Sequence, residues 1–334
     1  MRRSSRFIPS AVTAGCAALA LTLAGCSGAA PAAESDPEGD QLKIGLYVAG
    51  AFGDRSYYDA AAEAIPKLEE EFKAVVATYE AKQDAQAYAP LMQDAAAANE
   101  LLFVVGDQVT DIAVEVASQN PDTKVVLVNT LVPREGVASV GFDWASICYP
   151  AGVLAALANR ESGANSVGFV MGFKTPAMTT CESSFHAAAV ATNPALKLVS
   201  QAAGTFSDPN KGYEVATALS QQGAHSTLTL AGLTTQGVVK AAQEGQPIAP
   251  ITINFGQPAD VSLAGAITRV DVLMLDAAKK HADGSLQLGG VDEFAYQEGA
   301  TEWILNDALV NEESEAAVKD VIEKIKSGTL DPKA

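Results

Sequence analysis

Aromatic residues, histidines and cysteines are scarce in this chain of 334 residues, and this scarcity excludes several kinds of function. The 3 histidines, His186, His225 and His281, are scattered, with no paired spacing that suits a metal ion. Neither the zinc motif H-E-x-x-H nor the nucleophile elbow G-x-S-x-G occurs. The glycines of segment 45–53 match neither the dinucleotide fingerprint nor the phosphate loop. We therefore expect no metal site, no cofactor and no catalytic residue.

Positive charge is also in short supply. Lys and Arg total 22 against 40 Asp and Glu, which gives a net charge of −18. An acidic surface without a basic stripe repels phosphate groups, so we expect no nucleic-acid partner. Beyond residue 40 no segment is long and apolar enough to form a membrane helix. A hydrophobic content of 48% with few aromatic residues is typical of an Ala- and Val-rich α/β protein.

The N-terminus has the features of an export signal. Three arginines precede an apolar run over residues 11–25, which is too short for a stable membrane span. The run ends in Leu23-Ala24-Gly25-Cys26, a sequence like the bacterial lipobox, where the thiol of Cys26 carries the lipid. An ordinary signal peptide with a chance cysteine is the alternative. We predict a lipoprotein signal peptide over 1–25, a flexible acidic tether over 26–40, and a lipid-anchored, extracytoplasmic location at the cell membrane.

Two cysteines, Cys148 and Cys181, lie in the expected folded body. Export to an oxidising compartment permits a disulfide between them. The alternative is a pair of buried free thiols, which behave as small hydrophobic side chains. A Cα separation well above about 7 Å would exclude the bond.

The body alternates short apolar runs with helical patterns. Expected strands are 42–48, 74–79, 101–105, 124–129, 138–142, 166–171, 196–202, 226–231 and 248–253. Expected helices are 57–72, 88–97, 110–118, 146–160, 181–191, 209–222, 235–243, 302–309 and 314–327, with the last two on the second lobe. Continuous Val, Ile and Leu runs suit parallel strands covered on both faces. The fold class is therefore α/β, with two doubly wound parallel-sheet lobes joined by a hinge.

The chain is expected to cross between the lobes three times, near 143–146, near 254–257 and near Gly284. These crossings place residues 41–145 plus 256–284 in the N-terminal lobe. They place residues 146–255 plus 285–334 in the C-terminal lobe.

Five short blocks resemble one known family. They are Gly53-Asp54-Arg55-Ser56-Tyr57, Val167–Gly172, Gly204–Gly212 with Gln222-Gly223-Ala224, Ala231–Val238, and Lys326-Ser327-Gly328. In order and spacing they are similar to the basic membrane protein family of lipoproteins, which includes purine nucleoside receptor-like solute-binding proteins. The resemblance runs from about Ile44 to Asp331. It implies a type I periplasmic-binding-protein-like fold and ABC import of nucleosides or related small solutes.

The sequence departs from this family at several positions of the ligand site. The family's Asn after the aromatic residue is Tyr58 here, and a lysine expected after a later strand is Thr268. The segment 252–257 lacks the family's two acids but keeps Gln257, and the stretch 143–146 reads Asp-Trp-Ala-Ser.

Residues that follow the strands are the candidate ligand contacts, because the carboxyl ends of strands line the crevice of such sheets. In the first lobe, Tyr57 suits stacking on a planar ligand or packing in the core. Asp54 is either a helix cap or a ligand contact. Asp107, which follows the third strand where the family has an apolar or aromatic residue, suits a polar ligand group or a solvated loop.

Candidates near the hinge and in the second lobe complete the set. Trp144 either lines the crevice or wedges the hinge, while Phe173 and Thr234 follow strands of the second lobe. Asn254 and Gln257 offer donors and acceptors together, which suits recognition of hydroxyl or amide groups.

These features favour a monomeric solute-binding protein that delivers a small polar solute, such as a nucleoside, to ABC permease and ATPase subunits. Its membrane attachment is through the lipid anchor alone. The alternatives are an extracytoplasmic ligand sensor or a surface interaction lipoprotein on the same fold, and then an enzyme.

Overall fold

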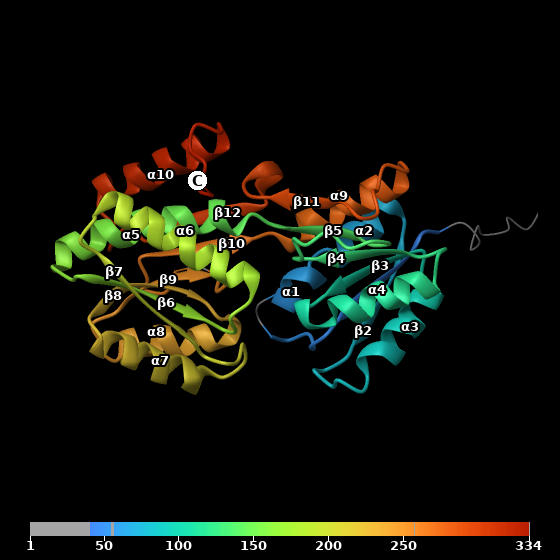
Figure 1. Cartoon of the computed structure of the whole chain (residues 1–334), viewed down its shortest axis with the longest axis horizontal. Coiled ribbons are helices and arrows are strands. Elements are labelled where there is room, and N and C mark those ends of the chain that lie inside the picture. The colour runs from blue at the N-terminus through green and yellow to red at the C-terminus, as the bar shows by residue number, and fades with distance from the viewer. Residues whose placement is uncertain (1–40, 55–56, 257, 334) are drawn as a thin grey trace, which may run out of the picture. The chain divides into compact units, whose positions relative to one another are not determined.

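Two six-stranded sheets organise the folded body in the computed structural model, which describes residues 41–54, 57–256 and 258–333. Each sheet is the centre of one lobe, with helices on both faces (Figure 1). This confirms the predicted α/β class with parallel-dominated sheets. The predicted signal peptide, the tether and the lipidation site Cys26 lie outside the described residues.

The first sheet has the strand order β11-β5-β4-β3-β1-β2, and its paired strands are all parallel. Its strands are β1 (Lys43–Val48), β2 (Val75–Glu80), β3 (Leu101–Val105), β4 (Lys124–Val128), β5 (Ala138–Phe142) and β11 (Val291–Phe294). Side chains alternate along β1: Ile44, Leu46 and Val48 enter one core, whereas Tyr47 and Ala49 enter the core on the opposite face. Burial on both faces explains why this strand is a continuous apolar run.

Helices cover both faces of the first sheet (Figure 1). One face carries α1 (Tyr57–Ala62), α2 (Ile65–Phe72) and α9 (Val270–Ala282), and the other carries α3 (Tyr88–Ala98) and α4 (Thr110–Gln119). The single helix predicted over 57–72 is divided into α1 and α2. Pro66 lies in the first turn of α2, where its missing N–H costs nothing, so it suits the start of a new helix.

The second sheet has the order β12-β10-β9-β8-β6-β7. Its strands are β6 (Ser166–Met171), β7 (Lys197–Ala202), β8 (Ala224–Leu230), β9 (Ala249–Ile253), β10 (Ala264–Thr268) and β12 (Thr301–Leu305). The helix predicted over 302–309 is wrong, because residues 301–305 form β12 and pair antiparallel with β10. The sequence Thr-Glu-Trp-Ile-Leu is rich in β-branched and aromatic residues, which favour a strand.

The helices of the second lobe also form two layers. In Figure 1, α5 (Trp144–Ser162), α6 (Pro176–Thr192) and α10 (Glu312–Lys326) lie above the sheet, and α7 (Pro209–Gln221) and α8 (Thr235–Gln243) lie below it. Asp208 accepts hydrogen bonds from the backbone N–H groups of Asn210 and Lys211, which confirms the helix start predicted there. Helix α10 packs on α5, as expected for the last helix.

The chain crosses between the lobes at three places, two of which differ from the prediction. The first crossing joins β5 to α5 at Asp143, as expected. The second follows β10 at Arg269, because β10 belongs to the second sheet and α9 packs on the first. The third joins β11 to β12 over residues 295–300. The predicted boundaries 256–284 and 285–334 are therefore corrected: β10 moves to the second lobe and β11 to the first.

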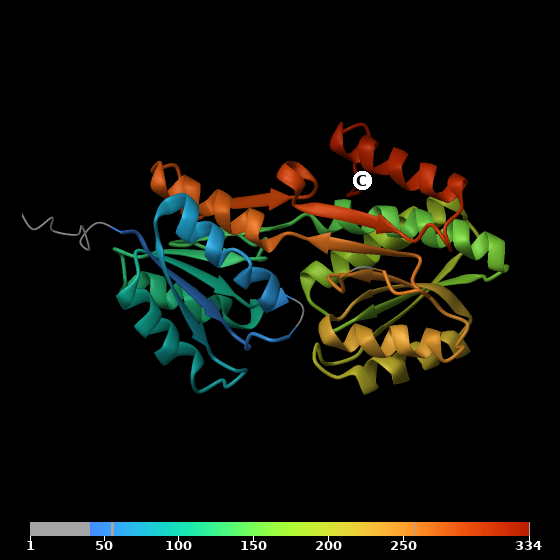
Figure 2. The same cartoon turned by 180° about the vertical axis from the view of Figure 1, so that it is seen from behind.

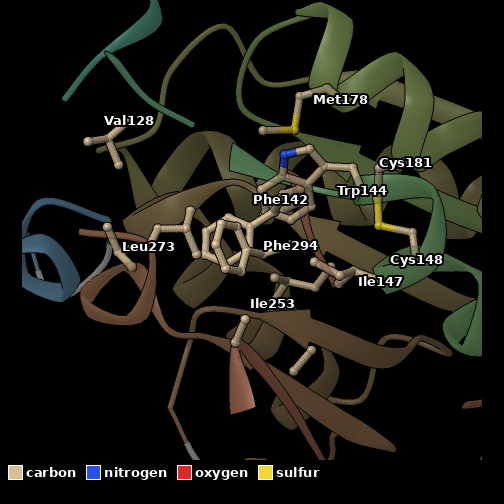
Figure 3. Packing of buried hydrophobic residues seen from close by; sticks show 14 of the residues in the cluster. Val128, Phe142, Trp144, Ile147, Cys148, Met178, Cys181, Ile253, Leu273 and Phe294 are labelled. Atoms are coloured by element: carbon tan, nitrogen blue, oxygen red, sulfur yellow. A yellow bond between two sulfur atoms is a disulfide. The ribbon is translucent and has the colours of Figure 1, made fainter. Parts of the chain in front are cut away.

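Buried aromatic residues pack where the first and third crossings meet (Figure 3). Phe142 ends β5, Trp144 begins α5, and their rings lie edge to face with centroids 5.6 Å apart. Phe294, at the end of β11, belongs to the same core, as do Ile253 and Met178 of the second lobe. One continuous core therefore runs from the first lobe through the crossings into the second.

Charged side chains hold the second crossing. The carboxylate of Asp271 is 1% exposed and receives a two-pronged contact from Arg269, with Nε at 2.8 Å and Nη2 at 2.7 Å. Lys67 of α2 also pairs with Asp271. Burial opposes ionisation, but the hydrogen bonds and charges of Arg269 and Lys67 outweigh it and lower the pKa of Asp271. The start of α9 is thereby tied to α2.

A disulfide joins α5 to α6 close to the first crossing. Cys148 and Cys181 are both fully buried, and their Cα atoms are 5.2 Å apart. The sequence leaves open a disulfide or two free thiols, and the structure has the disulfide (Figure 3). None of the described helices combines the length and hydropathy required to span a membrane.

Candidate functional site

Asp54 is a cap of α1 in this structure. Its carboxylate oxygens accept hydrogen bonds from the backbone N–H groups of Tyr58, at 3.2 Å, and Asp59, at 3.1 Å. A carboxylate at a helix start satisfies amide groups that have no partner within the helix. Asp54 also lines a recess of about 340 Å³ at the ends of β1 and β2, formed by Ala51, Phe52, Gly53, Asp54, Tyr58, Lys82 and Gln83.

Two consecutive tyrosines begin α1, which lies on the side of the first lobe nearest the second lobe (Figures 1 and 2). The rings of Tyr57 and Tyr58 lie edge to face, 6.4 Å apart. Burial is the main cause that raises the pKa of both, so both remain neutral near pH 7. The Tyr57 hydroxyl is buried without a hydrogen-bond partner among the described residues. Tyr58 contacts Gln108, which hydrogen-bonds its side chain.

Asp107 begins the short helix η1 (Asp107–Val109) directly after β3. More than a third of its surface is open to solvent, yet burial raises the pKa of its carboxyl to about 6, against the opposing effect of a hydrogen bond from Thr130. Water therefore reaches the residue, while the surrounding protein partly desolvates its carboxylate. Asp107 is near enough to Tyr57 for its charge to raise the pKa of that hydroxyl.

The second lobe contributes a pair of exposed aromatic rings. Phe173 follows β6 and is 47% exposed, and Phe206 follows β7 and is 38% exposed. Their centroids are 5.3 Å apart with the rings edge to face. Gly172 makes room for this pair, since a Cβ there would lie 2.2 Å from ring atoms of Phe206. Exposed phenylalanines at strand ends offer an apolar surface to a planar solute.

Thr234 is part of the scaffold and not a ligand contact in this structure, which corrects the prediction. It is fully buried, in the short helix η2 (Gly232–Thr234). Its hydroxyl donates to the carbonyl oxygen of Thr205 and accepts from the backbone N–H of Asp208. These contacts tie the loop after β8 to the loop after β7, which carries Phe206.

The carbonyl oxygen of the Asn254 side chain is also committed to the protein. It accepts hydrogen bonds from Thr268, from the backbone N–H at 2.8 Å and from the hydroxyl at 2.9 Å. Asn254 has a φ of 56°, a left-handed conformation that asparagine tolerates better than most residues. These contacts join the ends of β9 and β10, so Asn254 positions the edge of the site. The predicted contact Gln257 lies outside the described residues.

Trp144 is buried at the first crossing. It is 2% exposed, and its Nε1 donates to Oδ1 of Asn129, in the loop after β4. A buried ring whose only polar atom is bonded inside the protein supports the packing of this crossing and offers no open stacking surface.

A second, larger hollow lies beside α6. Its volume is about 760 Å³, and most of its lining is polar: Ala145, Lys174, Thr175, Pro176, Thr179, Thr180, Ser183, Ser184, Ala187, Pro332 and Lys333. The C-terminal Lys333 pairs with Glu293 at 2.7 Å and Asp143 at 3.4 Å, so the end of the chain contacts the first crossing. This hollow is open, and neither Asp54 nor Tyr58 lines it.

Sequence reasoning did not propose Phe206 as a contact, and it named Tyr58 only as a departure from the family's ligand site. Gln108 follows Asp107 after β3, so the same position after a strand indicated it. Phe206 lies in the block 204–212 that carries the resemblance, two residues before the Asp208 helix start. Among the described residues no group of His, Cys, Asp and Glu side chains is arranged to hold a metal ion.

Two doubly wound lobes with polar and aromatic side chains after their strands define a solute-binding protein of the periplasmic type. Residues 41–331 match the family described as ABC transporter substrate-binding protein PnrA-like, and the chain belongs to this family. This confirms the resemblance noted in the sequence. The description of the family is that of a substrate-binding protein.

Individual relatives agree with this family. An uncharacterized lipoprotein of Pyrococcus horikoshii is 29% identical over 86% of this chain and 75% of its own length. The ABC transporter nucleoside-binding protein BmpA of Lactococcus lactis is 26% identical over 97% of each chain. A solved solute-binding protein of an ABC transporter system from Aeropyrum pernix has a TM-score of 0.73, at 20% identity, covering 87% of this chain and 92% of its own. This last likeness confirms the type I-like fold.

Proposed function

We propose that the protein is a lipid-anchored, extracytoplasmic receptor that encloses a small polar solute between its lobes and delivers it to an ABC importer. The observation that supports this most is the placement of polar groups and exposed aromatic rings after the strands of both sheets. Asp107 and Tyr58 belong to the first lobe, and Phe173 and Phe206 to the second. A solute bound by both sets would favour the closed arrangement, which is what a permease recognises.

The exposed rings and the family favour a planar solute. Phe173 and Phe206 offer an apolar surface, and stacking on an aromatic ring contributes about 0.5–1.5 kcal/mol beyond area burial. The nucleoside-binding relative of Lactococcus lactis supports a nucleoside or a related compound. The partners are the solute, the permease and the ATPase, and the protein is expected to act as a monomer.

A thermal-shift screen tests the binding function. Nucleosides, nucleobases, sugars and amino acids are added separately, and the melting temperature is measured. A ligand at about 100 times its Kd stabilises the folded state by about 2.7 kcal/mol, which is a clear rise in melting temperature. If no compound in the panel raises the melting temperature, the proposed function is contradicted.

The anchor is tested separately. The proposal places a diacylglyceryl group on the Cys26 thiol, so Cys26→Ala should release the protein from the membrane fraction. The mass of the N-terminal peptide of the membrane-bound protein should include the lipid. A Cys26→Ala variant that remains in the membrane fraction contradicts the anchor but leaves solute binding untouched.

A further inference from the structure

Asp107 is an acid that makes no ion pair within the described part of the chain. It follows β3, at the end of the sheet where the crevice of such folds lies. No Lys or Arg in the described parts of the chain forms an ion pair with it. Its one neutralising contact is the hydrogen bond from Thr130, and burial raises the pKa of its carboxyl to about 6. A partly desolvated carboxylate with so little compensation is costly in the empty protein.

The described side chains that interact with Asp107 are neutral. Its charge raises the pKa of the Tyr57 and Tyr58 hydroxyls in addition to burial, so both stay protonated near pH 7. Thr130, in the loop after β4, hydrogen-bonds to its carboxylate. The negative charge of Asp107 is therefore left for a group that comes from outside.

The backbone at this position is built for close packing. Gly106, which precedes Asp107, has a φ of 133°, and a Cβ there would lie 2.8 Å from the Cβ of Ala49. Only glycine adopts this conformation without strain and fits this space. The backbone of Asp107 is thus fixed at the end of β3. Nearby, the Tyr57 hydroxyl is buried and has no hydrogen-bond partner among the described residues.

We propose that Asp107 is a specificity-determining residue and that the solute carries a cationic nitrogen group which pairs with it. This inference rests on the proposed solute-binding function. A cation in the site supplies the missing counter-charge, and attraction is stronger in a partly desolvated recess than in water. An anionic solute would instead be repelled by Asp107. The net charge of −18 also attracts cations toward the protein.

Matched pairs of probes test this proposal. Two pairs differ mainly in charge: 1-methyladenosine and adenosine, and tryptamine and indole-3-ethanol. Binding of each probe to the full chain is measured by calorimetry at pH 7.5, for the wild type, Asp107→Asn and Asp111→Asn. Asp111 is the matched control, because it is an acid of α4 whose side chain is 96% exposed, outside the site. Melting temperatures confirm that each variant is folded.

The proposal expects the cationic member of at least one pair to bind roughly tenfold or more tightly than its neutral partner. Asp107→Asn should remove this preference, and Asp111→Asn should keep it. If neutral probes bind as well as cationic ones, or if Asp107→Asn keeps the preference, the inference is wrong while the proposed function stands. If no probe and no solute of the wider screen binds, both are overturned.

Discussion

Trp144 Nε1 donates a hydrogen bond to Oδ1 of Asn129 at 3.2 Å, and this bond joins the first residue of α5 to the loop after β4. The two residues belong to elements of different lobes and meet at the first crossing. Asn129 has a φ of 65°, so its backbone adopts the left-handed conformation that places its side chain at the hinge. The backbone conformation of Asn129 therefore determines whether the buried Nε1 of Trp144 has a hydrogen-bond acceptor.

Asn129→Ala should destabilise the protein by about 2–5 kcal/mol. Alanine is strained at a positive φ by about 1–2 kcal/mol, and the buried Nε1 of Trp144 loses its acceptor at a further cost of about 1–3 kcal/mol. Equilibrium unfolding in urea measures this change. Asn129→Gly keeps the left-handed conformation and isolates the hydrogen bond, so it should cost less. If both variants lose the same free energy of unfolding, alanine is not strained at this position and the prediction is wrong.

The disulfide predicts a second measurable effect. Replacing Cys148 and Cys181 together by Ser should lower the free energy of unfolding by about 2–4 kcal/mol, because the unfolded chain is then no longer constrained by the bond. Unfolding curves with and without a reducing agent measure the loss. The reducing agent should destabilise the wild type and leave the double variant unchanged. Alkylation of both thiols in the unfolded, unreduced protein would show that the bond is absent.

The sequence predicts the strands β1 to β9 but misses β10 and β11 and places a helix at β12. The strands that it does predict have a physical signature. Strands such as 101–105 and 166–171 are buried on both faces, so they appear as continuous apolar runs bounded by turn residues. The helix start at Asp208 is also local, because one side chain and the following proline determine it. Local features of this kind need no knowledge of the partners of each element.

The crossings and the roles of the site residues could not be read in this way. β10 belongs to the second sheet because it pairs with β9 and β12. β9 lies just before it in the sequence, whereas β12 lies much further along the chain, so no local pattern shows this pairing. Thr234 and Asn254 follow strands, as a ligand contact should. However, the Thr234 hydroxyl binds the loop after β7, and the Asn254 amide oxygen binds the end of β10. A position directly after a strand indicates that a residue lies at the edge of the site. Only the tertiary contacts show whether its side chain lines the site or holds another part of the protein in place.

The aromatic pair of the second lobe should matter for binding far more than for stability. Phe206→Ala should weaken binding of the solute found by the screen by roughly tenfold, since a stacking surface is lost. The free energy of unfolding should change by less than about 1 kcal/mol, because the ring is 38% exposed. Calorimetry and urea unfolding separate the two effects.

Gly172→Ala provides a second variant for the same surface. Its Cβ would lie 2.2 Å from ring atoms of Phe206, so the ring must move although no aromatic group is removed. Affinity should therefore fall in the same direction as in Phe206→Ala. If Gly172→Ala binds like the wild type and Phe206→Ala does as well, the aromatic pair is not part of the ligand surface.

Asp107 predicts a pH dependence of stability in the absence of ligand. Burial raises the pKa of its carboxyl to about 6 in the folded protein, whereas an unfolded Asp has a pKa of about 3.9. The folded state therefore binds the proton more tightly, and the contribution of Asp107 to stability is most favourable below about pH 4 and is lost as the pH rises through about 6. Tyr57, Tyr58 and Thr130, which surround it, do not titrate in this range.

Asp107→Asn removes this titration, so the empty variant should be more stable than the wild type at pH 7.5, with the difference shrinking toward pH 4. Melting temperatures measured from pH 4 to pH 8 give the comparison, and Asp111→Asn, which removes an exposed charge, should show no such trend. A cationic solute should reverse the order at pH 7.5, because it stabilises the charged carboxylate of the wild type and not the amide. A variant that is less stable than the empty wild type at pH 7.5 would mean that the carboxylate already has a stabilising partner within the protein.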